Sequence, residues 1–268
     1  MTVKATYFSL LLGLFAFVLM AAPVRAESDL ERTWNQAKVM VPSPDGGKPY
    51  QFKVSSKKGK AWFKAHAGLN MPVVVYMHGC TGFGGNDKKV LRKLAAQGYV
   101  VIAPNSMARK FRPLQCSSWT QKGGANPFVF DFRQAEIAYA LEQLWRADWA
   151  DWDRMALVGV SEGGLAAAHY RGEYFRARVI TQWTCHGTNL VRGISAPDDE
   201  PILAIVRKND PWYENNPNQS GDCGDFFGGR PGSESIVLEN GNHHDVMKDD
   251  TVINRITAFL DLNLSLRD

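Results

Sequence analysis

The sequence predicts an α/β protein, with a mostly parallel central sheet covered by helices on both faces. Three observations favour this class. Short apolar, β-branched runs of the kind found in doubly buried strands alternate along the chain with segments of helical periodicity. No internal repeat or second hydrophobic core interrupts this alternation. The 268 residues, 45% hydrophobic and 22% charged, are enough to bury a substantial core.

The N-terminus carries the pattern of a secretory signal peptide. Lys4 precedes an apolar run at 7–22, and Val24 and Ala26 stand at the two small-residue positions of a cleavage site. The alternative is an uncleaved membrane anchor, for which the run is somewhat short. No cysteine stands at the cleavage point to carry a lipid. We therefore expect cleavage after Ala26 and export of residues 27–268 as one domain, periplasmic or secreted, with no stable membrane anchor.

The charge balance gives no indication of a nucleic-acid partner. The formal net charge is +4, and loss of Lys4 and Arg25 with the leader lowers it to about +2. The basic residues are scattered, and their one small cluster, at 57–60, is interpreted as a solvated turn. The sequence carries no indication of oligomeric state.

The first part of the mature chain, residues 27–70, is interpreted as an N-terminal extension. It contains a short helical piece near 29–36, then strands near 50–54 and 61–65. The sequence Pro-Ser-Pro-Asp-Gly-Gly at 42–47 is rich in turn formers and separates the first pieces.

The main sheet begins with two buried strands. The run at 72–77 is continuously apolar and leads into a glycine-rich loop, 78–85. Helical spacing follows over 87–97 and ends at Gly98, a typical C-cap residue. The second strand is expected at 99–103, before a long irregular stretch.

The second half of the chain repeats the alternation of strand and helix. Its first helix is amphipathic, and its last has apolar residues spaced to face the sheet. The segment 211–232 is rich in Asn, Gly, Asp and Pro and is interpreted as a loop insertion. The expected elements are a helix at 128–145, a strand at 155–160, a helix at 164–168, strands at 177–184, 202–206 and 235–239, and a helix at 251–262.

The pattern G-x-S-x-G at residues 159–163 is the strongest functional signal. It lies between a buried strand and a helix of small residues, so Ser161 is expected at the apex of a sharp turn. The flanking glycines allow a turn that side chains would block. A plain strand-to-helix turn is the alternative.

A serine nucleophile requires a base and an orienting acid, which in this topology follow it in the order acid, then histidine. Asp210 directly follows the strand at 202–206, at the edge where the carboxyl ends of parallel strands meet. A turn aspartate before proline is the alternative for Asp210. The base stands in the segment 241–245, where His243 and His244 are adjacent and point in different directions.

An oxyanion hole requires two backbone N–H groups directed at the developing negative charge. One is expected from Glu162, the residue after the nucleophile. The other is expected from Cys80, in the loop after the strand at 72–77, because nearby glycines leave its backbone accessible. A merely flexible turn at 78–80 is the alternative.

Together these segments resemble the α/β-hydrolase superfamily, and within it the dienelactone hydrolase-like branch. The resemblance rests on His-Gly-Cys at 78–80, the elbow at 159–164, Asp210, and Gly-Asn-His-His-Asp at 241–245. It covers roughly residues 72–262.

The resemblance implies a fold and a set of catalytic residues. In this branch the last motif commonly reads G-x-x-H-[DS]-[FV], which aligns the catalytic histidine with His244 and favours it over His243. Dienelactone hydrolases proper carry a cysteine at the elbow, where this chain has Ser161. The resemblance therefore implies a triad of Ser161, Asp210 and His244 and leaves the dienelactone substrate open.

The expected function is that of an exported serine hydrolase. It would cleave a small-molecule carboxylic ester or related acyl bond through a covalent acyl-enzyme, without cofactor or metal. A serine peptidase of the same fold and a catalytically silent binding protein are the alternatives.

Four cysteines in an exported chain indicate two disulfides, and no spacing indicates zinc. Three pairings are possible. Because all four cysteines fall in loops expected at one rim of the sheet, we predict the bridges Cys80–Cys116 and Cys185–Cys223. Four aromatic residues are candidates for the pocket mouth, with core packing equally open to each: Trp119, Trp183, Trp212 and Tyr213.

Overall fold

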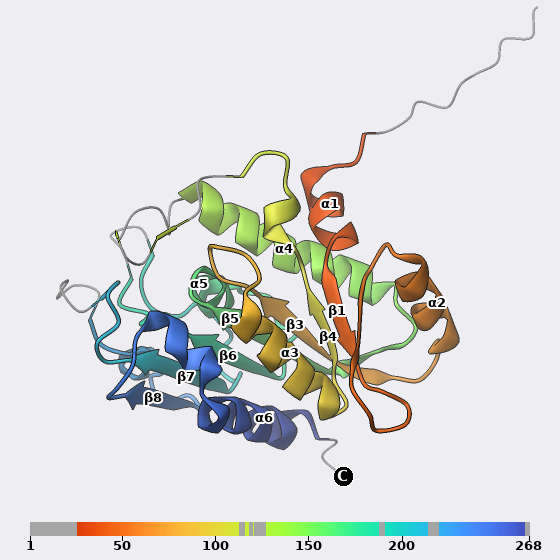
Figure 1. The fold of residues 1–268 in the computed structure, drawn as a ribbon. Helices are drawn as coiled ribbons and strands as arrows, with labels where there is room; N and C mark the ends of the chain where they lie inside the picture. Colours follow the sequence, from red (N-terminus) through yellow and green to blue (C-terminus); the bar gives the residue numbers. More distant parts are fainter. Residues whose placement is uncertain are drawn as a thin grey trace, which may run out of the picture.

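One eight-stranded sheet organises the fold (Figure 1), with the strand order β2-β1-β4-β3-β5-β6-β7-β8. β1 runs antiparallel to both of its neighbours, and the strands from β3 to β8 are parallel to one another, as the sequence predicts. The strands are β1 (Lys38–Val41), β2 (Tyr50–Lys53), β3 (Met71–Met77), β4 (Val100–Ala103), β5 (Ala150–Val160), β6 (Ala177–Thr181), β7 (Ile202–Arg207) and β8 (Glu234–Leu238).

The computed structural model describes most of the chain. The expected leader, except Ala26, and parts of the two long loops lie outside the described residues. The described residues are 26–112, 116–117, 120, 127–187, 191–213 and 220–265.

Helices cover both faces of the sheet, and alternation along β3 shows how each face is buried. Val73, Val75 and Met77 face the side covered by α4 and α5, whereas Val74 and Tyr76 face the side covered by α3 and α6 (Figure 1). The helices are α1 (Asp29–Asn35), α2 (Lys57–Ala65), α3 (Gly85–Ala96), α4 (Pro127–Trp145), α5 (Glu162–His169) and α6 (Asp250–Leu264), with 3₁₀ turns η1 (Ser106–Ala108), η2 (Cys223–Phe226) and η3 (His243–Lys248).

The strand predicted at 61–65 is wrong, because these residues belong to α2. Ser56 caps this helix, and its side chain accepts a hydrogen bond from the Gly59 amide at 3.0 Å. A Cβ at Gly59 would lie 2.4 Å from the Lys53 carbonyl oxygen, so the glycine lets the first turn approach the end of β2 closely. The basic cluster at 57–60, predicted to be a solvated turn, is the first turn of this helix, and its three lysines are exposed.

β1 was not predicted, because it is a run of only four residues between a helix and the turn-rich stretch. Its residues from Val39 to Val41 are buried because the strand lies between β2 and β4. Residues before β3 thus supply two strands of the same sheet rather than an appendage beside it.

The remaining elements agree with the predicted order. β5 is longer than the predicted strand and begins at Ala150, while α5 begins at Glu162, immediately after the candidate nucleophile. Gly98 follows α3 with φ +102°, the left-handed conformation expected after a helix end. No helix in the described ranges is long and apolar enough to cross a membrane.

Candidate active site

Ser161 stands at the turn between β5 and α5 in an unusual backbone conformation. Its φ is +56° and its ψ is −115°, a region that costs free energy for a residue with a side chain. Its amide donates to the Thr181 carbonyl at 2.8 Å, and its carbonyl accepts from the Leu165 amide at 2.9 Å. Backbone contacts on both sides therefore hold the strained conformation.

The two flanking glycines are sterically required at this turn. A Cβ on Gly159 would lie 2.1 Å from the Gly163 carbonyl oxygen, and a Cβ on Gly163 would lie 2.0 Å from the Met77 carbonyl oxygen. Both distances are far inside van der Waals contact. The G-x-S-x-G spacing thus reflects close packing of β3, β5 and α5 around the serine.

Ser161, His243 and Asp210 form one chain of hydrogen bonds. His243 Nε2 lies 3.0 Å from Ser161 Oγ, and His243 Nδ1 lies 2.5 Å from Asp210 Oδ2. The Asp210 side chain is fully buried, and its second oxygen accepts from the Trp212 amide at 3.1 Å. With Nδ1 donating to the carboxylate, Nε2 is free to accept the serine proton.

The expectation that His244 fills this position is wrong, because the structure places the neighbouring histidine there. His243 is buried against the end of β7, whereas His244 is exposed. The Asn242 side chain accepts from the His244 amide at 3.0 Å and caps the turn that starts at His243. Successive residues of a 3₁₀ turn point about 120° apart, so only one of the two rings can face Ser161.

His244 remains at the edge of the site. Its ring centroid is 5.4 Å from that of His243, and it borders the same cavity. Its pKa is lowered, first by partial burial and then by the neighbouring His243. Its carbonyl accepts from Asn86 Nδ2 at 3.0 Å, which ties η3 to the start of α3.

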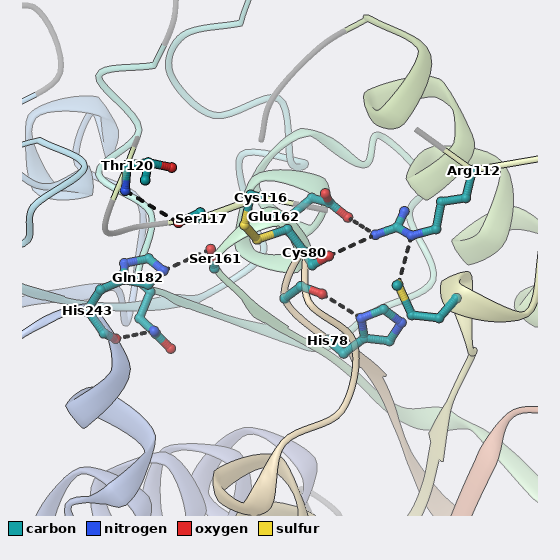
Figure 2. The surroundings of a disulfide bond; sticks show 12 residues. His78, Cys80, Arg112, Cys116, Ser117, Thr120, Ser161, Glu162, Gln182 and His243 are labelled. Atoms are coloured by element: carbon teal, nitrogen blue, oxygen red, sulfur yellow. Dashed lines mark hydrogen bonds and ion pairs between the residues drawn. A yellow bond between two sulfur atoms is a disulfide. The ribbon is translucent and has the colours of Figure 1, made fainter. Parts of the chain in front are cut away.

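Gln182, which the sequence argument did not single out, holds the main chain of His243. It lies just after β6 with φ +58°, and its buried side chain donates to the His243 carbonyl (Figure 2). Its own carbonyl accepts from the Tyr213 hydroxyl at 2.6 Å. The order of β6, β7 and β8 in the sheet brings Gln182, Tyr213 and His243 together, and no local motif marks Gln182.

The residues expected to supply the oxyanion donors lie on either side of Ser161. A Cβ on Gly79 would lie 3.6 Å from Ser161 Cβ, so the loop that carries Cys80 passes directly beside the serine. Glu162 is the first residue of α5, where backbone N–H groups have no partner within the helix. The two amides thus belong to peptides that flank the serine.

His78 orders the loop that carries Cys80. Its ring is fully buried, with Nδ1 2.6 Å from the Gly79 carbonyl and Nε2 accepting from the Ser106 amide at 3.1 Å. Burial holds the pKa of His78 well below its ordinary value. A neutral ring with its proton on Nδ1 satisfies both contacts.

Both predicted disulfides are present, and both lie at the predicted rim. Cys80–Cys116 joins the loop after β3 to the long segment after β4 (Figure 2), and Cys185–Cys223 joins the segment after β6 to η2. No described cysteine is free. The first bridge borders the cavity beside the serine, and the second does not.

A cavity of about 330 Å³ opens at Ser161. Trp212 lines it, while Trp183 and Tyr213 are buried in the core beneath. Trp119 lies outside the described residues. The lining residues are Gly79, Cys80, Thr81, Gly82, Gly84, Asn86, Asp87, Cys116, Ser117, Val160, Ser161, Gln182, Trp212, His243, His244 and Met247. Within the described part of the chain, no group of three His, Cys, Asp or Glu side chains is arranged to hold a metal ion.

Comparison with known families matches one family over more than half of the chain. The model of the dienelactone hydrolase family matches residues 60–220. No curated protein sequence matches the chain at a significant level.

Solved structures show the same fold at low sequence identity. An esterase from Pyrobaculum calidifontis has a TM-score of 0.52 and 14% identity, covering 88% of this chain and 90% of its own. The acylaminoacyl peptidase of Pyrococcus horikoshii also has a TM-score of 0.52, with 13% identity over 75% of this chain. This chain spans only 38% of the peptidase chain. At these identities the likeness establishes the α/β-hydrolase fold alone.

Proposed function

Because the chain belongs to the dienelactone hydrolase family, and so to a family of hydrolases, we propose that it is an exported serine hydrolase that cleaves carboxylic esters or related acyl bonds. The observation that carries this proposal is the hydrogen-bond chain from Ser161 through His243 to Asp210. A serine hydroxyl is a weak nucleophile alone, and a buried, oriented imidazole within hydrogen-bond reach is what activates it.

In the first half of the reaction, Ser161 Oγ attacks the substrate carbonyl carbon while His243 Nε2 takes its proton. Asp210 stays ionised and stabilises the imidazolium. The carbonyl oxygen becomes an oxyanion, which the Cys80 and Glu162 amides bind. Collapse of the tetrahedral intermediate breaks the bond to the leaving alkoxide, which takes the proton from His243 and departs as an alcohol.

In the second half, water hydrolyses the acyl-enzyme. His243 takes a proton from the water as its oxygen attacks the acyl carbon, and a second oxyanion forms at the same two amides. The intermediate then releases the carboxylic acid, and the proton returns to Ser161. The protein is unchanged over the cycle.

The cavity supports a small acyl or alcohol group as substrate. Its volume of about 330 Å³ is at the lower end of the range for small-molecule sites. Trp212 supplies an aromatic wall, while Thr81 and Ser117 supply hydroxyl groups. Amides react by the same steps, so a peptidase activity is separated from an esterase activity only by substrate preference.

Export is supported by the leader pattern and by the two disulfides, which persist in oxidising compartments. The mature protein would then act in the periplasm or outside the cell. Mass spectrometry of the protein recovered from a periplasmic or culture fraction tests this, because cleavage after Ala26 leaves Glu27 as the first residue.

The activity is tested with a panel of p-nitrophenyl esters and matched p-nitroanilide amides. We expect hydrolysis of short esters that Ser161→Ala reduces to background, and faster turnover of esters than of the corresponding amides. Faster turnover of the amides would make the protein a peptidase. Absence of hydrolysis across the panel, together with no labelling by a fluorophosphonate, would identify it as a silent member of the family.

A further inference from the structure

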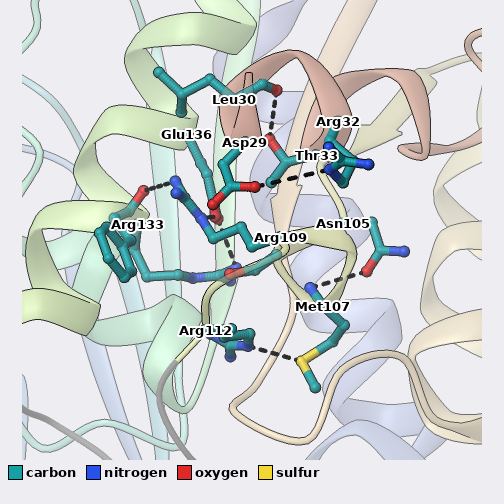
Figure 3. A network of polar contacts seen from close by, with 12 residues as sticks. Asp29, Leu30, Arg32, Thr33, Asn105, Met107, Arg109, Arg112, Arg133 and Glu136 are labelled. Atoms are coloured by element: carbon teal, nitrogen blue, oxygen red, sulfur yellow. Dashed lines mark hydrogen bonds and ion pairs between the residues drawn. The ribbon is translucent and has the colours of Figure 1, made fainter. Parts of the chain in front are cut away.

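Five charged side chains are buried together between α4 and the candidate active site. None of these side chains is more than 8% exposed. Three guanidinium groups face two carboxylates, and Figure 3 shows how Arg109, Arg133 and Glu136 lie relative to one another. The five are Arg109, Arg112, Arg133, Glu136 and Glu162.

Glu162 has two neighbours of opposite charge. Its Oε1 lies 3.0 Å from Arg112 Nη2 and 3.6 Å from Arg133 Nε. Burial raises the pKa of this carboxyl group, and the two guanidinium groups oppose that shift. Because Glu162 directly follows the nucleophile, these contacts restrain the first residue of α5.

The same two arginines bind the loop on the other side of the serine. Arg133 Nη2 donates to the His78 carbonyl at 2.6 Å, and Arg112 Nη2 donates to the Cys80 carbonyl at 3.4 Å. Figure 2 shows the guanidinium group of Arg112 joined by dashed lines to the side chain of Glu162 and to the carbonyl of Cys80. We call Arg112, Arg133 and Glu162 the arginine clamp.

Each candidate oxyanion donor belongs to a peptide group whose carbonyl is already bound. The Cys80 N–H shares its peptide with the Gly79 carbonyl, which lies 2.6 Å from His78 Nδ1. The Glu162 N–H shares its peptide with the Ser161 carbonyl, which accepts from the Leu165 amide at 2.9 Å. In a trans peptide the N–H points away from the C=O, so fixing the carbonyl fixes the direction of the donor.

We propose that Arg112 and Arg133, through Glu162, are positioning residues that fix the separation of the Cys80 and Glu162 amides. This inference rests on the proposed function, because it assigns those amides to the oxyanion. The three side chains of the clamp do not line the substrate cavity, and the only contact of the clamp with the reacting atoms is through the backbone amide of Glu162. It preorganises two donors that are needed only when negative charge develops on the substrate oxygen.

The clamp therefore affects the transition state more than substrate binding. Complete loss of one oxyanion donor typically lowers kcat by about 10²–10³-fold. Loosening both donors without removing either is expected to lower kcat by about 10–100-fold and to change KM by less than about threefold. A role in stability alone would lower the melting temperature and leave kcat of the folded protein unchanged.

The test compares Glu162→Gln and Arg112→Lys with a matched control, Arg109→Lys. Both substitutions in the clamp retain the backbone amides. The control alters an arginine of the same cluster that is 5% exposed and pairs with Glu136 at 2.6 Å. Among the described residues, the side-chain contacts of Arg109 join it to α4, and none joins it to residues 78–80 or 162.

Three quantities are measured for each variant: kcat and KM on a p-nitrophenyl ester, the affinity for a trifluoromethyl ketone, and the melting temperature. The ketone forms a tetrahedral adduct with an oxyanion and so reports on the two donors. We expect Glu162→Gln and Arg112→Lys to lower kcat and ketone affinity by similar factors, while Arg109→Lys lowers only the melting temperature. If Glu162→Gln does not fold, Arg112→Lys carries the test.

Three results would count against the proposals. Hydrolysis that is lost in Ser161→Ala but keeps its wild-type kcat in both clamp variants overturns the clamp and leaves the proposed function standing. A kcat that falls as much in Arg109→Lys as in the two clamp variants also overturns the role of the clamp. The loss of kcat would then follow the stability of the charged cluster. Hydrolysis that survives Ser161→Ala refutes the proposed function, and the role of the clamp with it.

Discussion

His243 Nδ1 lies 2.5 Å from Asp210 Oδ2, although 33 residues of sequence separate the two side chains. Asp210 follows β7 and His243 follows β8, and these strands are parallel neighbours in the sheet. Their carboxyl ends therefore meet at one edge, beside the turn that carries Ser161. The contact fixes which ring nitrogen faces the serine, and our mechanistic proposal depends on it.

Replacing Asp210 by Asn should lower kcat by about 10⁴-fold without unfolding the protein, because the amide can donate to Nδ1 and hold the wrong tautomer. Steady-state hydrolysis of a p-nitrophenyl ester measures the effect. Asp225→Asn is the control. The Asp225 side chain is 69% exposed, and it lies beside His186 rather than in the candidate active site. Equal activity in the two variants would contradict the role of Asp210.

Removing the disulfide beside the cavity should lower both stability and activity. A bridge that closes 36 residues of sequence, Cys80–Cys116, is expected to contribute about 4 kcal/mol to the free energy of unfolding. The double variant Cys80→Ser, Cys116→Ser keeps the backbone amide at position 80. It removes the covalent link that restrains the loop carrying this amide, so kcat should also fall. Urea unfolding and ester hydrolysis measure the two effects.

The second bridge provides the comparison for this experiment. Cys185–Cys223 spans 38 residues and does not border the cavity. The double variant Cys185→Ser, Cys223→Ser should therefore lose similar stability but keep more of its kcat. If both double variants lose kcat equally, the first bridge has no special relation to the oxyanion loop.

Gly159→Ala should prevent stable folding or lower the free energy of unfolding by about 3 kcal/mol or more. The added methyl group would meet the backbone of Gly163 at 2.1 Å, and neither segment can move without displacing β5 or α5. Gly85→Ala is the control, because a Cβ there has nothing within 4 Å. A Gly159→Ala protein with wild-type stability would show that the packing at the elbow is looser than described.

Stability should fall as the pH drops below about 6.5, because burial lowers the pKa of three histidines, His78, His169 and His244. The pKa of His169 falls to about 4, and that of His78 falls well below its ordinary value. Each residue binds fewer protons in the folded state than in the unfolded state. Its stabilising contribution is therefore complete above the unfolded pKa and declines as the pH falls toward the folded one.

Urea unfolding between pH 7.5 and 4.5 tests this dependence. His169→Gln removes one of these three titrating groups, so the stability of the variant should fall less steeply with decreasing pH than that of the wild type. His66→Gln is the control, because that ring is only partly buried and stacks on Trp62 near the surface. Identical slopes in wild type and His169→Gln would contradict the prediction.

Local patterns in the sequence predicted most of the strands and helices. The buried runs at β3, β4, β6 and β7 are continuous and β-branched, so their burial on both faces could be read directly. Short elements at the edge failed, because the four residues of β1 carry too little pattern to separate a strand from a loop. At α2 the predicted strand was wrong, because the Ser56 cap and the close approach allowed by Gly59 favour the helix.

The site was predictable where spacing alone fixes geometry, as at Ser161 and Asp210. The choice between His243 and His244 could not be predicted, because it depends on the direction in which the chain runs from β8 into η3. The role of Gln182 depends on the pairing of strands. The arginine clamp could not be predicted from the sequence, because arginine is usually exposed. Only the three-dimensional fold shows that Arg112 and Arg133 are buried.

The most direct test of the central proposal is fluorophosphonate labelling of Ser161 in His243→Ala and His244→Ala, with the modified peptide identified by mass spectrometry. We predict that His244→Ala is labelled at a rate close to that of the wild type, whereas His243→Ala and Ser161→Ala are not labelled. Rapid labelling of His243→Ala together with loss of labelling in His244→Ala would contradict the assignment of His243 as the base.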